Sequence, residues 1–125
     1  MVKILLFIGS GSFIGSVFRY LISRYIQESV ISSFPFGTFI VNILGCFLLG
    51  VFFGISERGD VFNMETRMFL TIGFCGGFTT FSTFSNENLA MIRDGSILQV
   101  ALYSAGSVFL GILATYLGNL IIKSL

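Results

Sequence analysis

The sequence has no histidine and few charged residues, and these absences exclude several classes of function. Without histidine, a catalytic site lacks the commonest general base and the commonest metal ligand. Charged residues make up only 10% of the chain and the net charge is +1, so no basic surface is available for nucleic acid. No cluster of lysine or arginine indicates capture of lipid headgroups either.

Cysteine is also scarce. Cys46 and Cys75 lie in apolar stretches and have no paired spacing with each other or with further metal-ligating residues. We interpret both as small buried hydrophobic side chains, with a metal or disulfide role as the alternative.

Apolar residues dominate instead, at 54% of the chain, which indicates an integral membrane protein. The basic, apolar N-terminus superficially resembles a signal peptide, but apolarity resumes at Phe13 and no Ala-x-Ala-like cleavage site follows. We therefore predict an all-α membrane protein with a single domain, residues 1–125, of four transmembrane helices. They are expected at about 3–25, 37–56, 68–92 and 96–122.

The third predicted helix has an unusual centre. Residues 68–86 carry no charge, yet two adjacent glycines, Gly76 and Gly77, precede two β-branched residues, Thr79 and Thr80. These residues are poor helix formers, so we predict a break near 76–80 at mid-membrane. Non-helical backbone at that depth is tolerated only where protein buries it or where it lines a wet cavity, so the break predicts a binding or conduction site.

Small residues and a few polar side chains mark the other helices. Glycines spaced along the first two helices, such as Gly11, Gly15 and Gly45, predict close helix contacts. Arg19 is either an arginine extending to the interface or a cation at an aqueous vestibule. Asn42 is either an interhelical hydrogen-bonding residue or an amide that faces a permeation path.

The fourth helix carries a polar strip. Tyr103, Ser107, Gly111 and Thr115 are spaced four apart and share one face. Their hydroxyls either bond back to their own helix or line a path.

Cations give no clear orientation. The expected topology places Lys3, Arg58, Arg67 and Lys123 on one side and Arg19, Arg24 and Arg93 on the other. Because the positive-inside rule needs a clear bias, this four-to-three split predicts insertion in both orientations and pairing as an antiparallel two-fold dimer.

Three segments together resemble one known family. They are Gly15-Ser16-Val17-Phe18-Arg19-Tyr20, Gly37-Thr38-Phe39-Ile40-Val41-Asn42-Ile43-Leu44-Gly45 and Gly73-Phe74-Cys75-Gly76-Gly77-Phe78-Thr79-Thr80-Phe81-Ser82-Thr83-Phe84. In this order they closely resemble the Fluc (CrcB) family of bacterial fluoride channels. The resemblance covers all four predicted helices.

The resemblance implies an antiparallel, dual-topology homodimer in the bacterial inner membrane. It would export fluoride from the cytoplasm by passive permeation through two pores, with a structural sodium ion at the dimer centre held by the backbone carbonyls of Gly76 and Thr79. Arg19 would mark the aqueous mouth. The implied pore residues are Asn42, Phe81, Ser82, Thr83, Phe84, Tyr103, Ser107 and Thr115. Gly111 departs from the hydroxyl spacing of the family's last helix.

Elementary chemistry is compatible with a small anion. Phenylalanine rings have a positive edge, and amide and hydroxyl groups donate hydrogen bonds to an ion that loses water. Composition alone would not distinguish fluoride from chloride.

Three other readings remain. A proton-coupled small multidrug exporter needs a carboxylate deep in a helix, and we expect all six acidic residues in connectors or at helix ends, with Glu87 the nearest candidate. A structural subunit would not need a polar broken helix. A membrane enzyme lacks a visible nucleophile–base pair or metal cluster, so we predict that the protein is not an enzyme.

Overall fold

The computed structural model describes all 125 residues and contains only helices. Three helices are long: α1 (Val2–Ser29), α2 (Phe36–Ser56) and α6 (Ile97–Lys123). Between α2 and α6 lie α3 (Met64–Met68), the π-helix η1 (Phe69–Cys75), α4 (Gly76–Phe78) and α5 (Phe81–Arg93). Because α3, η1 and α4 follow one another without a gap, they form one continuous helical segment.

The three long helices are each long and apolar enough to cross a membrane. This agrees with the predicted all-α membrane protein. The predicted third span, 68–92, corresponds to η1, α4 and α5 with the end of α3, so its length is divided between shorter pieces.

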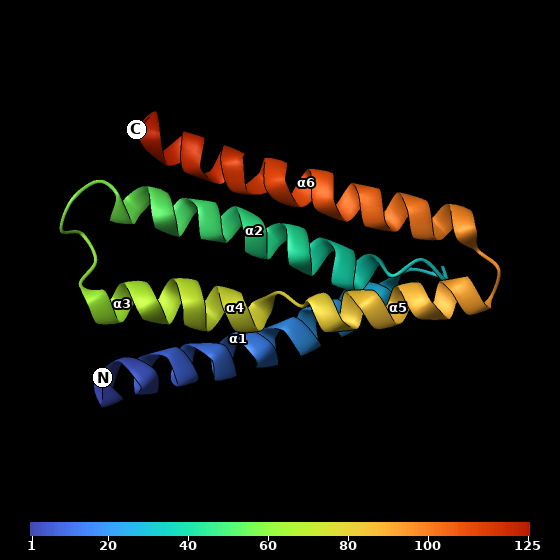
Figure 1. The fold of residues 1–125 in the computed structure, drawn as a ribbon, viewed down its shortest axis with the longest axis horizontal. Helices are drawn as coiled ribbons and strands as arrows, with labels where there is room; N and C mark the ends of the chain where they lie inside the picture. The colour runs from blue at the N-terminus through green and yellow to red at the C-terminus, as the bar shows by residue number, and fades with distance from the viewer.

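The helices run up and down in an elongated bundle, shown in Figure 1. α2 packs against α6, while α1 packs against η1 and α4. Both termini lie at one end of the bundle, together with the connector from α2 to α3, and the other two connectors lie at the opposite end (Figure 1). Both termini lie at one end because the chain passes along the bundle an even number of times, as the sequence predicted.

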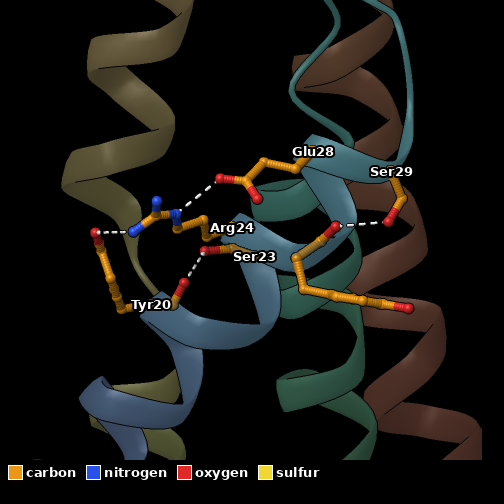
Figure 2. Close-up of polar contacts among 6 residues, drawn as sticks. Tyr20, Ser23, Arg24, Glu28 and Ser29 are labelled. Atoms are coloured by element: carbon orange, nitrogen blue, oxygen red, sulfur yellow. Dashed lines mark hydrogen bonds and ion pairs between the residues drawn. The ribbon is translucent and has the colours of Figure 1, made fainter.

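The first helix is longer than predicted, because it continues past residue 25 to Ser29. Polar contacts along its last turns account for the extension (Figure 2). Arg24 Nε donates to Glu28 Oε1 at 2.8 Å, one turn along the helix, and Arg24 Nη1 donates to the Tyr20 hydroxyl at 3.2 Å. Paired charges at this spacing stabilise a helix, so polar residues that were expected in a connector lie inside α1.

The two connectors opposite the termini are short and well bonded. The side chain of Gln27 donates to the Phe34 carbonyl at 3.1 Å and accepts from the Gly37 amide at 3.0 Å, which joins the end of α1 to the start of α2. After α5, Gly95 has a φ of +77°. Its amide donates to the Ile92 carbonyl, and this glycine-based helix ending forms a tight turn between α5 and α6.

Glycines allow α1 to lie directly on the segment η1–α4. A Cβ atom at Gly11 or Gly15 would collide with backbone atoms of η1, and one at Gly77 would collide with backbone atoms of Ser12. The close helix contacts predicted from these small residues are confirmed. Between the helices, Val41, Phe78 and Tyr103 are the largest fully buried side chains.

The helix interruption is narrower than the predicted range of 76–80. Gly76, Gly77 and Phe78 are helical in α4, and only Thr79 and Thr80 have extended backbone. Glycine propensity favoured an earlier break, but the close contact between Gly77 and Ser12 stabilises the helix through tertiary packing. The glycine pair therefore serves packing at Gly77, and the two threonines carry the change in backbone direction.

Candidate functional site

The interruption is held by a pair of hydrogen bonds from a different helix. Asn42, on α2, accepts from the Thr80 amide through Oδ1 at 2.8 Å and donates from Nδ2 to the Thr80 carbonyl at 3.1 Å. One side-chain amide thus satisfies both backbone groups of an extended residue, as a neighbouring strand would. Of the two alternatives for Asn42, the interhelical hydrogen bond is observed, and Nδ2 retains a second N–H that this pair does not use.

Thr80 also begins α5. Its hydroxyl accepts from the Thr83 amide at 3.2 Å, the usual role of an N-cap threonine. The same hydroxyl donates to Thr83 Oγ1 at 3.1 Å and lies 3.4 Å from Ser82 Oγ. Ser82 and Thr83, both predicted pore residues, therefore lie in a small hydroxyl cluster at the start of α5.

These bonds divert two amides from their usual helical acceptors. In a continuous helix the Thr80 amide would bond the Gly76 carbonyl, and the Thr83 amide would bond the Thr79 carbonyl. Here the first donates to Asn42 and the second to the Thr80 hydroxyl. The carbonyls of Gly76 and Thr79, which the family resemblance implies as sodium ligands, are thereby left without their helical partners.

Arg19 contacts the same region. Its Nε donates to the Gly77 carbonyl at 3.0 Å, and Ser16 Oγ lies 3.5 Å from that oxygen. A cation at the C-terminal end of a helix interacts favourably with the helix dipole. Arg19 was expected near the end of the first helix, but α1 continues ten residues further, so the side chain is half-buried against the interruption.

A cavity of about 230 Å³ opens beside the interruption. It has room for several water molecules or a partly hydrated small ion. No charged side chain lines it. Its lining comes from α2, the interruption, α5 and α6, and consists of Asn42, Cys46, Thr79, Thr80, Phe81, Phe84, Ser107 and Val108.

The two predicted pore phenylalanines belong to a row of rings. Phe81 and Phe84 have centroids 5.5 Å apart, and Phe84 lies 4.8 Å from Tyr103. Phe81 is 78% exposed, whereas Tyr103 is fully buried. The row therefore leads from the exposed Phe81 ring beside the cavity into the bundle. Because Phe81 is so exposed, packing contributes little to its position.

The predicted polar strip on α6 divides into three different environments. The Tyr103 hydroxyl donates to Glu87 at 2.7 Å. The Ser107 hydroxyl oxygen is buried at the cavity and has no hydrogen-bond partner. Thr115 donates to the carbonyls of Cys46 and Gly111, at 3.0 and 3.1 Å, and does not line this cavity. Within the strip, Ser107 is therefore the residue that lines the cavity, and its buried hydroxyl has no partner in the protein.

Residues 6–119 match the family model described as CrcB-like protein, Camphor Resistance (CrcB). The chain belongs to this family. A protein named fluoride-specific ion channel FluC from Flavobacterium psychrophilum is 45% identical over 98% of this chain and 99% of its own length. One of the same name from Phocaeicola vulgatus is 50% identical, over 92% of this chain and 93% of its own length.

Membership of the CrcB-like family confirms the resemblance stated from the three sequence segments. The relatives are channels, so the prediction that the protein is not an enzyme is also confirmed. With three helices able to cross a membrane, a CrcB-like chain of this kind is a multi-pass membrane protein.

The position of Glu87 corrects one prediction. We expected every acidic residue in a connector or at a helix end, but Glu87 lies well inside α5. Its two carboxylate oxygens accept from Tyr103 and from Thr38, at 2.7 and 2.8 Å. The helix begins only at Phe81, which places Glu87 nearly two turns along it. The acid is thus an acceptor within a hydrogen-bonded group of three helices.

Sequence reasoning missed three residues that line the cavity: Thr80, Cys46 and Val108. Thr80 was considered only as a poor helix former, although threonine is also among the residues favoured at the N-cap of a helix. Cys46 was interpreted as a buried hydrophobic residue, yet it lines the cavity one turn beyond Asn42. Its spacing of four from Asn42 was the available signal.

Proposed function

We propose that this protein is a fluoride-selective channel whose pore passes through the cavity beside Thr79 and Thr80. The observation that carries the proposal is the unpartnered hydroxyl of Ser107, buried at a cavity that it shares with Asn42, Phe81 and Phe84. A buried hydroxyl normally has a partner, so a hydrogen-bond acceptor that enters the cavity would complete this one. The names of the relatives supply fluoride as that acceptor.

The lining suits a small anion. Ser107 can donate its O–H, Asn42 has an unused N–H, and the edges of Phe81 and Phe84 carry partial positive charge. Donors of this kind replace part of the hydration shell of an ion. Because no fixed cation lines the cavity, the bound anion can leave again. Fluoride moves passively, and in the cell its gradient directs it outward from the cytoplasm.

The other pore residues extend this path along α5 and α6. Ser82 and Thr83 contribute hydroxyls near the interruption, and Tyr103 contributes its ring through Phe84. Thr115 is assigned to the pore only through its place on the strip. Arg19 attracts anions toward the mouth while it is held by Gly77.

The active unit in this proposal is an antiparallel homodimer with two pores in the bacterial inner membrane. Two features support it. Cations show only a weak bias between the two ends of the bundle, four at the end with the termini and two at the other, with Arg19 held at the interruption, and a weak bias is compatible with dual insertion. At Gly76 the surface is open, with no atom within 4 Å of an added Cβ, so a second chain can approach the interruption there.

A structural sodium ion at the dimer centre fits the residues present. The Gly76 and Thr79 carbonyls lack their helical partners, and hard cations prefer such oxygens. Two chains related by a two-fold axis would contribute four oxygens. The ion supplies positive charge that offsets the carbonyl dipoles and favours anions nearby.

Fluoride efflux from liposomes tests the proposal. Vesicles that contain the purified protein and are loaded with potassium fluoride should release it rapidly once valinomycin provides a path for potassium. Chloride-loaded vesicles serve as the control. Chloride release at the fluoride rate would contradict selectivity, while fluoride release that requires a proton gradient would favour the exporter, with Glu87 as its carboxylate.

A further inference from the structure

We propose that the side chains of Asn42 and Thr80 position the Gly76 and Thr79 carbonyls as a cation site, because they withdraw the two amides that would otherwise occupy those oxygens. The inference rests on the proposed sodium site and goes beyond it by naming the residues that create it. Asn42 thus has a structural role toward the cation that is separate from its proposed contact with the anion.

The first withdrawal is made by Asn42. The Thr80 amide has two alternative acceptors. In a continuous helix it would donate to the Gly76 carbonyl, but here it donates to Asn42 Oδ1 at 2.8 Å. The second contact, from Asn42 Nδ2 to the Thr80 carbonyl at 3.1 Å, keeps the acceptor in place. Removal of Oδ1 would leave the part-buried Thr80 amide without this acceptor, and the acceptor that a continuous helix would give it is the Gly76 carbonyl.

The second withdrawal is made by Thr80 itself. Its hydroxyl accepts from the Thr83 amide at 3.2 Å and caps α5 at Phe81, so this amide is not available to the Thr79 carbonyl, as it would be in a continuous helix. The hydroxyl is fixed in turn by Thr83 Oγ1 at 3.1 Å. Each proposed ligand oxygen therefore depends on one side-chain oxygen that competes for its helical donor.

The arrangement links two sites through one side chain. Asn42 lines the cavity with Ser107, and its acceptor oxygen controls whether the Gly76 carbonyl is free. Substitutions at Asn42 can therefore separate the two roles. Asn42→Asp retains an oxygen that accepts from the Thr80 amide but loses N–H donors, whereas Asn42→Leu has a similar size and no acceptor.

The experiment measures the thermal unfolding midpoint of the purified full-length protein in detergent as sodium replaces N-methylglucamine at constant ionic strength. Wild-type protein should be stabilised by sodium in a saturable manner. Asn42→Leu should need about tenfold more sodium or more for half the effect, a factor typical of one competing hydrogen bond. Asn42→Asp should keep a sodium response close to wild type while its fluoride efflux from liposomes is lost.

The outcomes separate this inference from the proposed function. If Asn42→Leu responds to sodium as wild type does, the positioning role is wrong, even though the cation site stands. If wild-type protein itself shows no sodium response, the proposed cation site fails first and the inference fails with it. A merely structural role for Asn42 would lower the unfolding midpoint at every sodium concentration without moving the half-effect.

Thr80 provides an independent variant in case Asn42→Leu does not fold. Thr80→Val keeps the side-chain shape and removes the hydroxyl, so the Thr83 amide can return to the Thr79 carbonyl and the half-effect should again move to higher sodium. Thr80→Ser retains the hydroxyl and should restore the wild-type response. Equal responses from the valine and serine variants would overturn the inference at this residue.

Discussion

At the scale of single residues, the cavity combines polar groups that are satisfied with one that is not. Asn42 and Thr80 pair with each other, and Thr83 pairs with Thr80, whereas the Ser107 hydroxyl is buried without a partner. An unpaired buried hydroxyl costs stability of about 1–3 kcal/mol. In the proposed channel, this hydroxyl serves ion binding rather than folding.

Ser107→Ala tests directly whether this hydroxyl lowers stability and promotes fluoride efflux. Because the hydroxyl has no partner in the protein, its removal should leave the thermal unfolding midpoint in detergent unchanged or raise it, while fluoride efflux falls. Ser104 is the matched control on the same helix, since its hydroxyl donates to Asn88 at 3.3 Å. Ser104→Ala should lower stability more than Ser107→Ala and reduce efflux less. Full efflux from Ser107→Ala would remove this residue from the pore.

Phe81→Ile distinguishes an ion contact from packing. The Phe81 ring is 78% exposed, so its replacement by another apolar side chain should cost at most about 1 kcal/mol of packing. If the ring edge contacts the anion, efflux should nevertheless fall steeply in protein that still elutes as a dimer. Phe13→Ile, at a ring of similar exposure on α1, should leave efflux intact. Equal efflux from both variants would argue for a packed aromatic row.

At the scale of elements, the interruption between α4 and α5 is built by competition for backbone donors. Two extended residues suffice because Asn42 on α2 and the Thr80 hydroxyl satisfy the backbone that leaves the helix. Arg19 on α1 adds a contact to the Gly77 carbonyl. Two neighbouring helices and the Thr80 hydroxyl thus hold the interruption in one geometry, which a site for ions requires.

A comparison of Gly76→Val with Thr79→Ser tests whether the surface at the interruption contacts a second chain. In the single chain an added Cβ at Gly76 meets no atom within 4 Å, so a valine there should be tolerated by the monomer fold. If a partner and a cation occupy this surface, Gly76→Val should disrupt the dimer on size-exclusion chromatography and abolish efflux. Thr79→Ser keeps its backbone carbonyl and should do little. Comparable tolerance of both substitutions would count against a cation at the dimer centre.

Much of this element arrangement could be predicted from the sequence, and the exceptions have physical reasons. Hydropathy located α1, α2 and α6 because lipid-spanning helices must be long and apolar. The break was placed too early because Gly77 is a packing residue against Ser12 rather than a helix breaker. The bond between Asn42 and Thr80 joins residues 38 apart in the chain, and no local pattern specifies it.

At the scale of the whole molecule, the chain is asymmetric in structure but nearly balanced in charge. Two cations at the end with the termini are paired with acids, Lys3 with Glu65 at 3.7 Å and Lys123 with Glu57 at 3.6 Å. Both pairs are at the surface and contribute little to stability. Because orientation follows the count of lysines and arginines rather than the net charge, these pairs do not set it, and the weak bias in that count leaves the orientation in the membrane weakly determined.

The predicted consequence is insertion in both orientations. Reporters fused to the C-terminus should be found on both sides of the membrane in one cell population. Two lysines added to the connector between α2 and α3 should fix one orientation and lower activity, and co-expression of an oppositely fixed chain should restore it. A wild-type chain found wholly in one orientation would falsify the antiparallel dimer.

The central claim is that the cavity beside Thr79 and Thr80 conducts fluoride. Efflux from liposomes that hold the purified protein tests it most directly, with the fluoride rate measured by a selective electrode against chloride. We expect rapid fluoride release without a proton gradient, negligible chloride release, and loss of the fluoride signal in Phe81→Ile and Asn42→Asp. Fluoride release at the rate of protein-free vesicles, or wild-type rates from both variants, would contradict it.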